Sequence, residues 1–284
     1  MGYYHDKLID EIRARGFSQS TEKSYATTIR KFITFSKVSP ARLTINHAKK
    51  FKLHLINNQK RAPATVNAQV AAIRFFFNHV IQKRFDEKDF TFVKRYRKLP
   101  DVLSKNDVIK ILNAIENIKH RAMFMGIYSC GLRKSEVMTL KSSDIDSDRM
   151  LIKIRCSKGR KDRFVPLSPL FLRYLRKYWQ EVEINRRHLL FPSNHPRKVY
   201  NPKTLNEILD SAAERAGIKK KVSVHTLRHS YATHSLEDGL NLRYIQLFLG
   251  HDRIDSTAIY THLVDYNKAN IKSPLDSIEK DLLR

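Results

Sequence analysis

The chain has 284 residues, of which 42% are hydrophobic, so it is long enough for two domains and too apolar for an intrinsically disordered protein. Lys and Arg number 54 against 28 Asp and Glu, which gives a formal net charge of +26. This charge favours a polyanionic partner, because each phosphate that a protein neutralises releases condensed counterions. Charge alone leaves nucleic-acid-binding, ribosomal and membrane-surface proteins open.

The sequence lacks the usual signals of a zinc finger, a secreted protein or a membrane span. The two cysteines, Cys130 and Cys156, form no C-x-x-C motif and fit a reducing cytosol. The N-terminus has no apolar signal core, and Asp6 spoils a myristoylation motif. The longest apolar stretch, residues 122–128, is too short to cross a bilayer. We therefore expect a soluble cytoplasmic protein with no membrane partner.

Residues 1–85 combine helical periodicity with a run of positive charge. Apolar residues recur at helical spacing after an opening pair, Leu8 and Ile12, as in Tyr25, Ile29, Phe32 and Ile33 or Val66, Val70, Ile73, Phe77 and Val80. From Lys23 to Phe85 there are thirteen Lys and Arg and no Asp or Glu. Most charge runs are only solvated faces. Because this one coincides with helical patterning, we predict a four-helix domain with a DNA-binding surface.

Residues 86–101 are predicted to be a linker. They have mixed charge, with the basic run Lys94-Arg95-Tyr96-Arg97-Lys98 and then Pro100. A linker that wraps around a duplex and a merely solvated connector would have the same composition, so both interpretations stay open.

A second domain is predicted over residues 102–272, where Ser104 and Asp107 resemble a capping box. Helical patterns occupy 105–117, 120–129, 169–183, 202–216, 225–237 and 241–249. Short strand-like runs occupy 150–155 and 163–167, joined by a basic turn. The predicted fold class is therefore mainly α with a small antiparallel β-sheet. Residues 273–284 are predicted to form a short amphipathic helix that either covers its own domain or docks on a neighbour.

Six polar residues of this domain form a candidate catalytic set. They lie in the motifs C-G-L-R-K-S-E, S-K-G-R-K, H-T-L-R-H, L-G-H and A-I-Y-T-H, and are Arg133, Lys158, His225, Arg228, His251 and Tyr260. Two arginines, a lysine and two histidines can surround one phosphate, which a tyrosine can attack. Each residue alone has an ordinary structural explanation. The ordered set is much less probable by chance than any one member.

The set can break a DNA phosphodiester without a metal. Tyr260 would be the nucleophile, since a phenol, with a pKa of about 10, is also a workable leaving group in the reverse step. Arg133 and Arg228 would neutralise the non-bridging oxygens, where charge grows in the transition state. If Ser223 caps a helix, His225 lies on the same face as Arg228 and could accept the phenol proton.

The remaining polar residues are expected either to assist the reaction or to stabilise the fold. Lys158, on the turn, could protonate the departing 5′-oxygen, and His251 could hydrogen-bond a non-bridging oxygen. Glu136 is expected to orient Arg133 or its loop. His225 and His229 have the spacing of a zinc pair, but no Glu or Cys completes an H-E-x-x-H pattern, so we expect no metal and no cofactor. His229 and His234 are interpreted as core or capping residues.

These motifs resemble the active site of the tyrosine recombinases, close to the Xer and integron-integrase branches. The likeness runs from about Ser104 to Leu263 and includes the nine-residue step from His251 to Tyr260. No helical insertion of the integron-integrase kind precedes His225, so we favour a Xer-like enzyme or a compact mobile-element integrase. The resemblance implies an N-terminal core-binding domain and a C-terminal catalytic domain that hold double-stranded DNA from opposite sides.

The resemblance also implies the reaction and its partners. Tyr260 would form a 3′-phosphotyrosyl link, and a homotetramer on paired specific sites would exchange strands through a Holliday junction. The helix at 273–284 would pack into the next protomer. A partner recombinase or regulator stays open. Two rival classes also remain: a type IB topoisomerase-like relaxase, and a catalytically silent DNA-binding protein that would not need all six residues.

Overall fold

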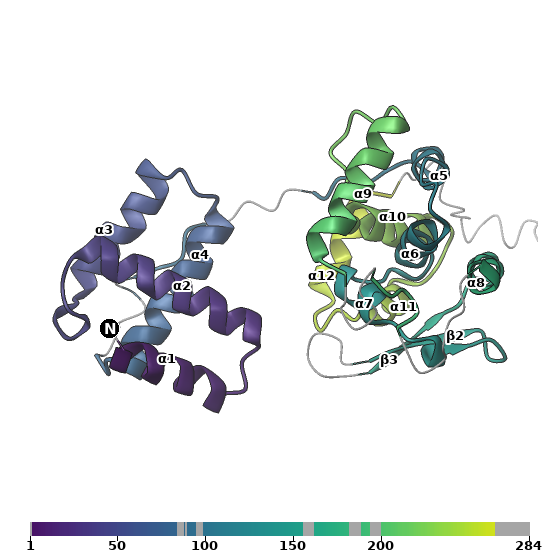
Figure 1. The fold of residues 1–284 in the computed structure, drawn as a ribbon. Coiled ribbons are helices and arrows are strands. Elements are labelled where there is room, and N and C mark those ends of the chain that lie inside the picture. The colour runs from purple at the N-terminus through teal and green to yellow at the C-terminus, as the bar shows by residue number, and fades with distance from the viewer. Residues whose placement is uncertain are drawn as a thin grey trace, which may run out of the picture. The chain divides into compact units, whose positions relative to one another are not determined.

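The computed structural model describes residues 2–83, 88, 90–94, 99–155, 162–181, 189–193 and 200–264. The chain divides into two compact units, Met1–Arg97 and Lys98–Arg284 (Figure 1). The division falls inside the predicted linker. The turn that carries Lys158 and the predicted helix at 273–284 lie outside the described residues.

The first unit is a bundle of helices, as predicted. Helices α1 and α2 span Gly2–Ala14 and Gln19–Ser36, and a 3-10 turn spans Pro40–Arg42. Helices α3 (Ile45–Leu53) and α4 (Pro63–Phe75) each continue into a π-helical turn, at His54–Asn58 and Phe76–Val80. The apolar positions found by periodicity form one core, which includes Leu8, Ile12, Ile29, Phe32, Val66, Val70, Ile73, Phe77 and Val80.

Local chemistry sets the ends of these helices. The Ser18 hydroxyl accepts a hydrogen bond from the Thr21 amide and starts α2. Helix α2 ends at Lys37, whose φ of 53° lies in the left-handed region that favours glycine. Pro63 occupies the first turn of α4, where a missing N–H costs nothing.

Residues 90–93, from the predicted linker, are fastened to the first unit by side chains. The amide of Asn67 donates to the Val93 carbonyl at 2.9 Å and accepts from the Val93 N–H at 2.7 Å. Arg74 donates to the carbonyl of Phe90, whose ring is 1% exposed in the helical core. This part of the linker therefore belongs physically to the bundle.

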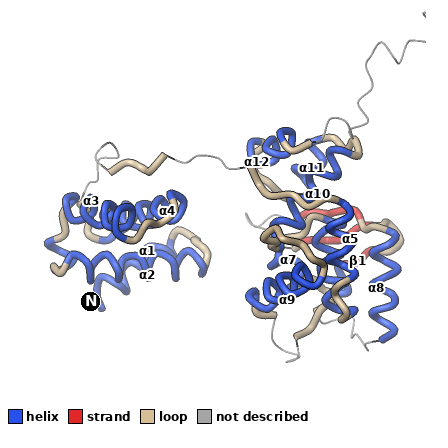
Figure 2. The backbone as a smooth tube through the Cα atoms, turned by 90° about the horizontal axis from the view of Figure 1, so that it is seen from above, coloured by secondary structure: helices blue, strands red, loops and turns tan. Residues whose placement is uncertain are grey.

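The second unit is helical with one small sheet. Its helices are α5 (Lys105–Asn113), α6 (Ile118–Cys130), α7 (Lys134–Thr139), α8 (Pro169–Glu181), α9 (Pro202–Arg215), α10 (Val224–Glu237), α11 (Leu242–Leu249) and α12 (Asp255–Ala258), with 3-10 turns η4 (Ser142–Asp144) and η5 (Ile259–His262). Strands β1 (Ile145–Asp146), β2 (Leu151–Ile154) and β3 (Arg163–Pro166) form an antiparallel sheet in the order β1-β2-β3. Figure 2 shows these strands among the helices.

Helix α6 lies in the core of this unit, where other helices pack against it. Nearly all of its later residues are buried, from Ala122 to Ile127, and it packs on both α8 and α10. A Cβ at Gly126 would lie 2.9 Å from the Phe171 ring of α8, so the two helices approach closely here.

No helix within the described ranges is long and apolar enough to cross a membrane.

Candidate active site

Several elements of the second unit bring the predicted polar residues together. Arg133 is the N-cap of α7, and α10 carries His225 and Arg228. The Ser223 hydroxyl accepts from the Thr226 amide at 3.1 Å, which confirms the predicted cap of α10. His251 follows α11, because Gly250 ends that helix in the left-handed region with a φ of 60°.

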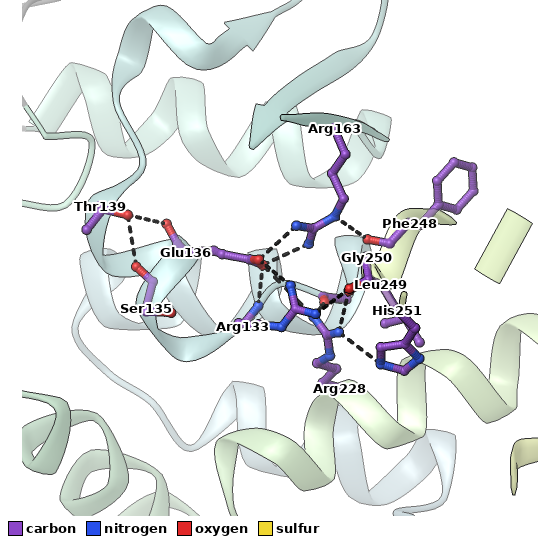
Figure 3. Close-up of polar contacts among 11 residues, drawn as sticks. Arg133, Ser135, Glu136, Thr139, Arg163, Arg228, Phe248, Leu249, Gly250 and His251 are labelled. Carbon is purple, nitrogen blue, oxygen red and sulfur yellow. Dashed lines mark hydrogen bonds and ion pairs between the residues drawn. The ribbon is translucent and has the colours of Figure 1, made fainter. Parts of the chain in front are cut away.

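Glu136 lies at the centre of the polar network (Figure 3). Its carboxylate accepts from Nη1 of Arg133 at 2.8 Å and from the Arg133 backbone N–H at 2.7 Å. Arg163, at the start of β3, donates through Nη1 and Nη2 to the two carboxylate oxygens, both at 2.8 Å. The expected role of Glu136 in orienting Arg133 is thus confirmed, and the carboxylate holds a second arginine as well.

Arg228 is the most deeply buried cation of the site, with a side chain 5% exposed. Nη1 donates to the Gly131 carbonyl at 2.6 Å. Nη2 donates to the Leu249 carbonyl at 2.5 Å (Figure 3). Burial, followed by the charge of Arg133, lowers the pKa of Arg228 to about 10. The guanidinium therefore stays charged at neutral pH.

The network carries more positive than negative charge. Arg133, Arg163 and Arg228 surround one carboxylate, with Arg228 Nη1 3.9 Å from Glu136 Oε2. Burial of Glu136 favours the neutral acid, but the hydrogen bonds and charges of Arg163 and Arg133 outweigh it and lower the pKa of Glu136 to about 2. Three cations against one anion leave an excess charge of two, which an anionic ligand can neutralise.

Arg133 is the arginine of the network most accessible to a ligand. Its side chain is 20% exposed, against 10% for Arg163 and 5% for Arg228. Nη2 of Arg133 donates to the Gly250 carbonyl at 2.6 Å, so the guanidinium links α7 to the turn before His251. Arg133 therefore combines a fixed orientation with a surface that an anion can contact.

His251 is neutral in this arrangement. Nε2 lies 3.3 Å from Nη2 of Arg228, which can only donate, so the ring hydrogen lies on Nδ1, 2.9 Å from the Thr257 hydroxyl. Burial, with the charges of Arg228 and Arg133, lowers the pKa of His251 to about 4. A bound anion would favour the protonated ring, which could then donate to it.

Tyr260 lies in η5 and is 1% exposed, packed in a small cluster with Ala232, Ile245 and Leu249. Its hydroxyl lies 2.9 Å from Nδ1 of His229, one turn along α10 from His225. Burial raises the pKa of the phenol. The interpretation of His229 as only a core or capping residue is therefore incomplete, whereas His234 is buried and contacts the Tyr128 hydroxyl at 2.8 Å.

The structure thus brings most of the predicted set into one region. Arg133, Arg228 and His251 are linked directly or through Gly250 and Leu249. The side chain of His225 keeps an exposed surface, but partial desolvation of its ring, followed by the charge of Arg228, lowers its pKa. Lys158 lies outside the described residues.

Arg163 is a member of the site that the sequence did not indicate. It opens the predicted strand at 163–167, but nothing in its local pattern indicates a partner 27 residues earlier in the chain. Its Nε also donates to the Phe248 carbonyl at 2.8 Å, and its side chain lies 3.2 Å from where a Cβ of Gly250 would stand. Only the tertiary fold reveals these contacts.

Comparisons with known proteins identify the family of this chain. Residues 101–266 match the phage integrase family, and residues 5–87 match the phage integrase N-terminal SAM-like domain. The chain is 33% identical over 282 residues to tyrosine recombinase XerD of Oceanobacillus iheyensis, covering 93% of each chain.

Two solved structures share the fold. A crystal structure of XerA recombinase aligns over 95% of this chain and 99% of its own, with 26% identity and a TM-score of 0.55. The XerH recombinase bound to palindromic difH substrate, in a post-cleavage complex, aligns over 90% of this chain and 80% of its own, with 23% identity and a TM-score of 0.70. The chain belongs to the phage integrase family and is a Xer-like tyrosine recombinase, an enzyme that cleaves and rejoins DNA.

Proposed function

We propose that this enzyme recombines specific double-stranded DNA sites through a covalent link on Tyr260. The observation that carries the proposal is the partly buried cluster of Arg133, Arg163 and Arg228 around one carboxylate. His251 contacts this cluster, and Tyr260 of η5 lies close enough to influence the charge of Arg228. An excess of fixed cations suits a phosphate whose charge grows during the reaction.

The proposed cleavage step moves one proton from the nucleophile and one to the leaving group. The Tyr260 oxygen attacks the phosphorus, and the bond from phosphorus to the 5′-oxygen breaks. His225 accepts the phenol proton, and Lys158 gives a proton to the departing 5′-oxygen. Arg133, Arg228 and His251 hold the non-bridging oxygens. A 3′-phosphotyrosyl ester remains, and a 5′-hydroxyl from another strand reverses the same steps without metal or ATP.

The proposal extends to the assembly. Four protomers would join two sites and exchange the strands in pairs through a Holliday junction, as the family resemblance implies. The segment 273–284 would pack into a neighbouring protomer and couple their active sites. A partner recombinase could replace some of the protomers. We expect the reaction to take place in the cytoplasm.

Covalent trapping on sheared genomic DNA, followed by sequencing of the attached ends, tests this proposal. The protein is incubated with the DNA and stopped with SDS, and the protein-linked fragments are sequenced. Recurrent ends that share a sequence, together with products joined to new flanks, support site-specific recombination. Scattered ends without joined products would instead favour a type IB topoisomerase-like relaxase.

The third possible result separates binding from chemistry. A wild-type protein that binds the fragments but forms no adduct would match a catalytically silent DNA-binding protein. A Tyr260→Phe variant serves as the matched control, because it keeps the ring and removes the attacking oxygen.

A further inference from the structure

The side chain of Tyr260 is closed off from solvent although the proposed reaction needs its oxygen. The residue is 1% exposed and lies among the apolar side chains Ala232, Ile245 and Leu249. A DNA phosphate cannot reach a hydroxyl in that position. The tyrosine side chain must therefore leave this buried position before it attacks. The contacts that hold it here are the ones that must break first.

The phenol has one hydrogen-bond partner in the described part of the chain, Nδ1 of His229 at 2.9 Å. A buried hydroxyl that cannot donate loses the interaction it has with water, so the phenol O–H is the donor and Nδ1 the acceptor. The rings lie at an interplanar angle of 48° with their centroids 5.7 Å apart. The histidine thus contacts the tyrosine both at its hydroxyl and at its ring.

His229 in this position is an acceptor and not the base that removes the proton. Burial, followed by the charges of His225 and Arg228, lowers the pKa of His229 to about 4. Burial raises the pKa of the phenol above its ordinary value of 10.0. Both shifts keep the proton on the phenol oxygen, so the imidazole accepts the hydrogen bond without taking the proton.

We propose that His229 is a positioning residue that holds Tyr260 buried, protonated and out of reach of DNA, and that strand cleavage requires this hydrogen bond to open. The inference rests on the proposed role of Tyr260 as the nucleophile. His225 lies one helical turn away on α10, with its ring centroid 6.4 Å from that of His229. A tyrosine released from His229 would therefore have a second imidazole close by.

Acetylation of tyrosine hydroxyls in the DNA-free protein tests the proposal directly. The probe is N-acetylimidazole, and peptide mass spectrometry gives the rate at each tyrosine. Tyr244, which is 55% exposed, serves as the reactive reference, and Tyr178, which is fully buried, reports global unfolding. In the wild type we expect Tyr260 to react at least about tenfold more slowly than Tyr244, because labelling needs local opening.

Two substitutions of His229 separate the hydrogen bond from simple packing. His229→Phe keeps a flat ring but removes the acceptor, and we expect Tyr260 to label at least about fivefold faster while Tyr178 stays protected. His229→Asn places an oxygen near the position of Nδ1, and we expect it to restore the protection. Unchanged labelling of Tyr260 in His229→Phe, or equal labelling in both variants, would overturn the proposal.

The test is independent of DNA cleavage. If the wild-type protein formed no covalent adduct on Tyr260, the proposed function would fail, whereas the labelling rates would still decide whether His229 holds the phenol. If the adduct formed but the labelling rates did not respond to His229, only the present inference would fail.

Discussion

Glu136 carries one negative charge among three arginines, and its side chain is 6% exposed. It fixes Arg133 through the backbone and the guanidinium, and it fixes Arg163 through two parallel hydrogen bonds. The positions of Arg133 and Arg163 thus depend on a residue that need not touch DNA.

Replacing Glu136 by Gln should destabilise the enzyme in a pH-dependent way. The pKa of Glu136 is about 2 in the folded protein, below the ordinary 4.5, so the folded state binds fewer protons and the stabilisation is present above pH 4.5. At pH 7 we expect Glu136→Gln to lower the free energy of unfolding by about 3 kcal/mol, from a pKa difference of about 2.5.

Urea unfolding of both proteins at several pH values measures this difference. The difference in free energy of unfolding between wild type and variant should become smaller as the pH falls from about 4.5 toward 2, because the wild-type carboxylate then becomes protonated. A difference in free energy of unfolding that stays constant down to the lowest pH at which both proteins fold would contradict the lowered pKa of Glu136.

Removal of Arg133 should slow chemistry more than it weakens DNA binding. Arg133→Ala takes away a fixed cation where charge grows, and losses of about 10²–10³-fold in rate are typical for such a group. The measurement is the single-turnover rate of adduct formation at saturating DNA. Lys105→Ala is a matched control, since Lys105 forms an exposed ion pair with Asp238. Equal rates for all three proteins would rule out Arg133 as part of the phosphate site.

Among the elements, those with one apolar face could be predicted from the sequence, whereas the short ones could not. Ile29 and Phe32 are buried because their spacing matches a helix that packs on one side. Helix α7 has only six residues and β1 only two, too short for a periodic pattern. Predicted helix 105–117 ends at Asn113, and its remainder forms a turn in which the Ile115 N–H donates to the Leu112 carbonyl.

The C-terminal end of α2 offers a test of the local rules. Lys37 has a φ of 53°, which a residue with a Cβ adopts at a cost, so Lys37→Gly should raise the free energy of unfolding by about 1 kcal/mol. Lys31 is exposed inside the same helix, and Lys31→Gly should lower that free energy by about 1 kcal/mol. Chemical denaturation compares the two. Changes of the same sign would refute this explanation of the helix end.

For the whole molecule, composition predicted a polyanionic partner, and the motif order predicted the family. The site was predicted as a set of residues but not as a network. The contacts of Arg163 with Glu136 and of His229 with Tyr260 were missed because the partners lie 27 and 31 residues apart in the sequence, so that only folding brings them together. Glu136 could be predicted because it lies three residues from Arg133 on the same short helix.

The net charge of +26 makes DNA binding strongly dependent on salt. If at least about six phosphates are neutralised, the affinity for a duplex should fall by about 10³-fold or more between 50 and 200 mM salt. Fluorescence anisotropy with a labelled duplex measures this dependence, and Tyr260→Phe should give the same slope as the wild type. An affinity that hardly changes over this range would argue against phosphate contacts as the main source of binding.

Mass spectrometry of the trapped adduct tests most directly whether Tyr260 becomes linked to DNA. After incubation with genomic fragments, the protein is denatured and digested with a protease and a nuclease, and the peptide that carries a nucleotide is sequenced. We predict that the nucleotide is attached to Tyr260 and that Tyr260→Phe yields no such peptide. A nucleotide on any other residue, or an undiminished adduct in Tyr260→Phe, would contradict the account.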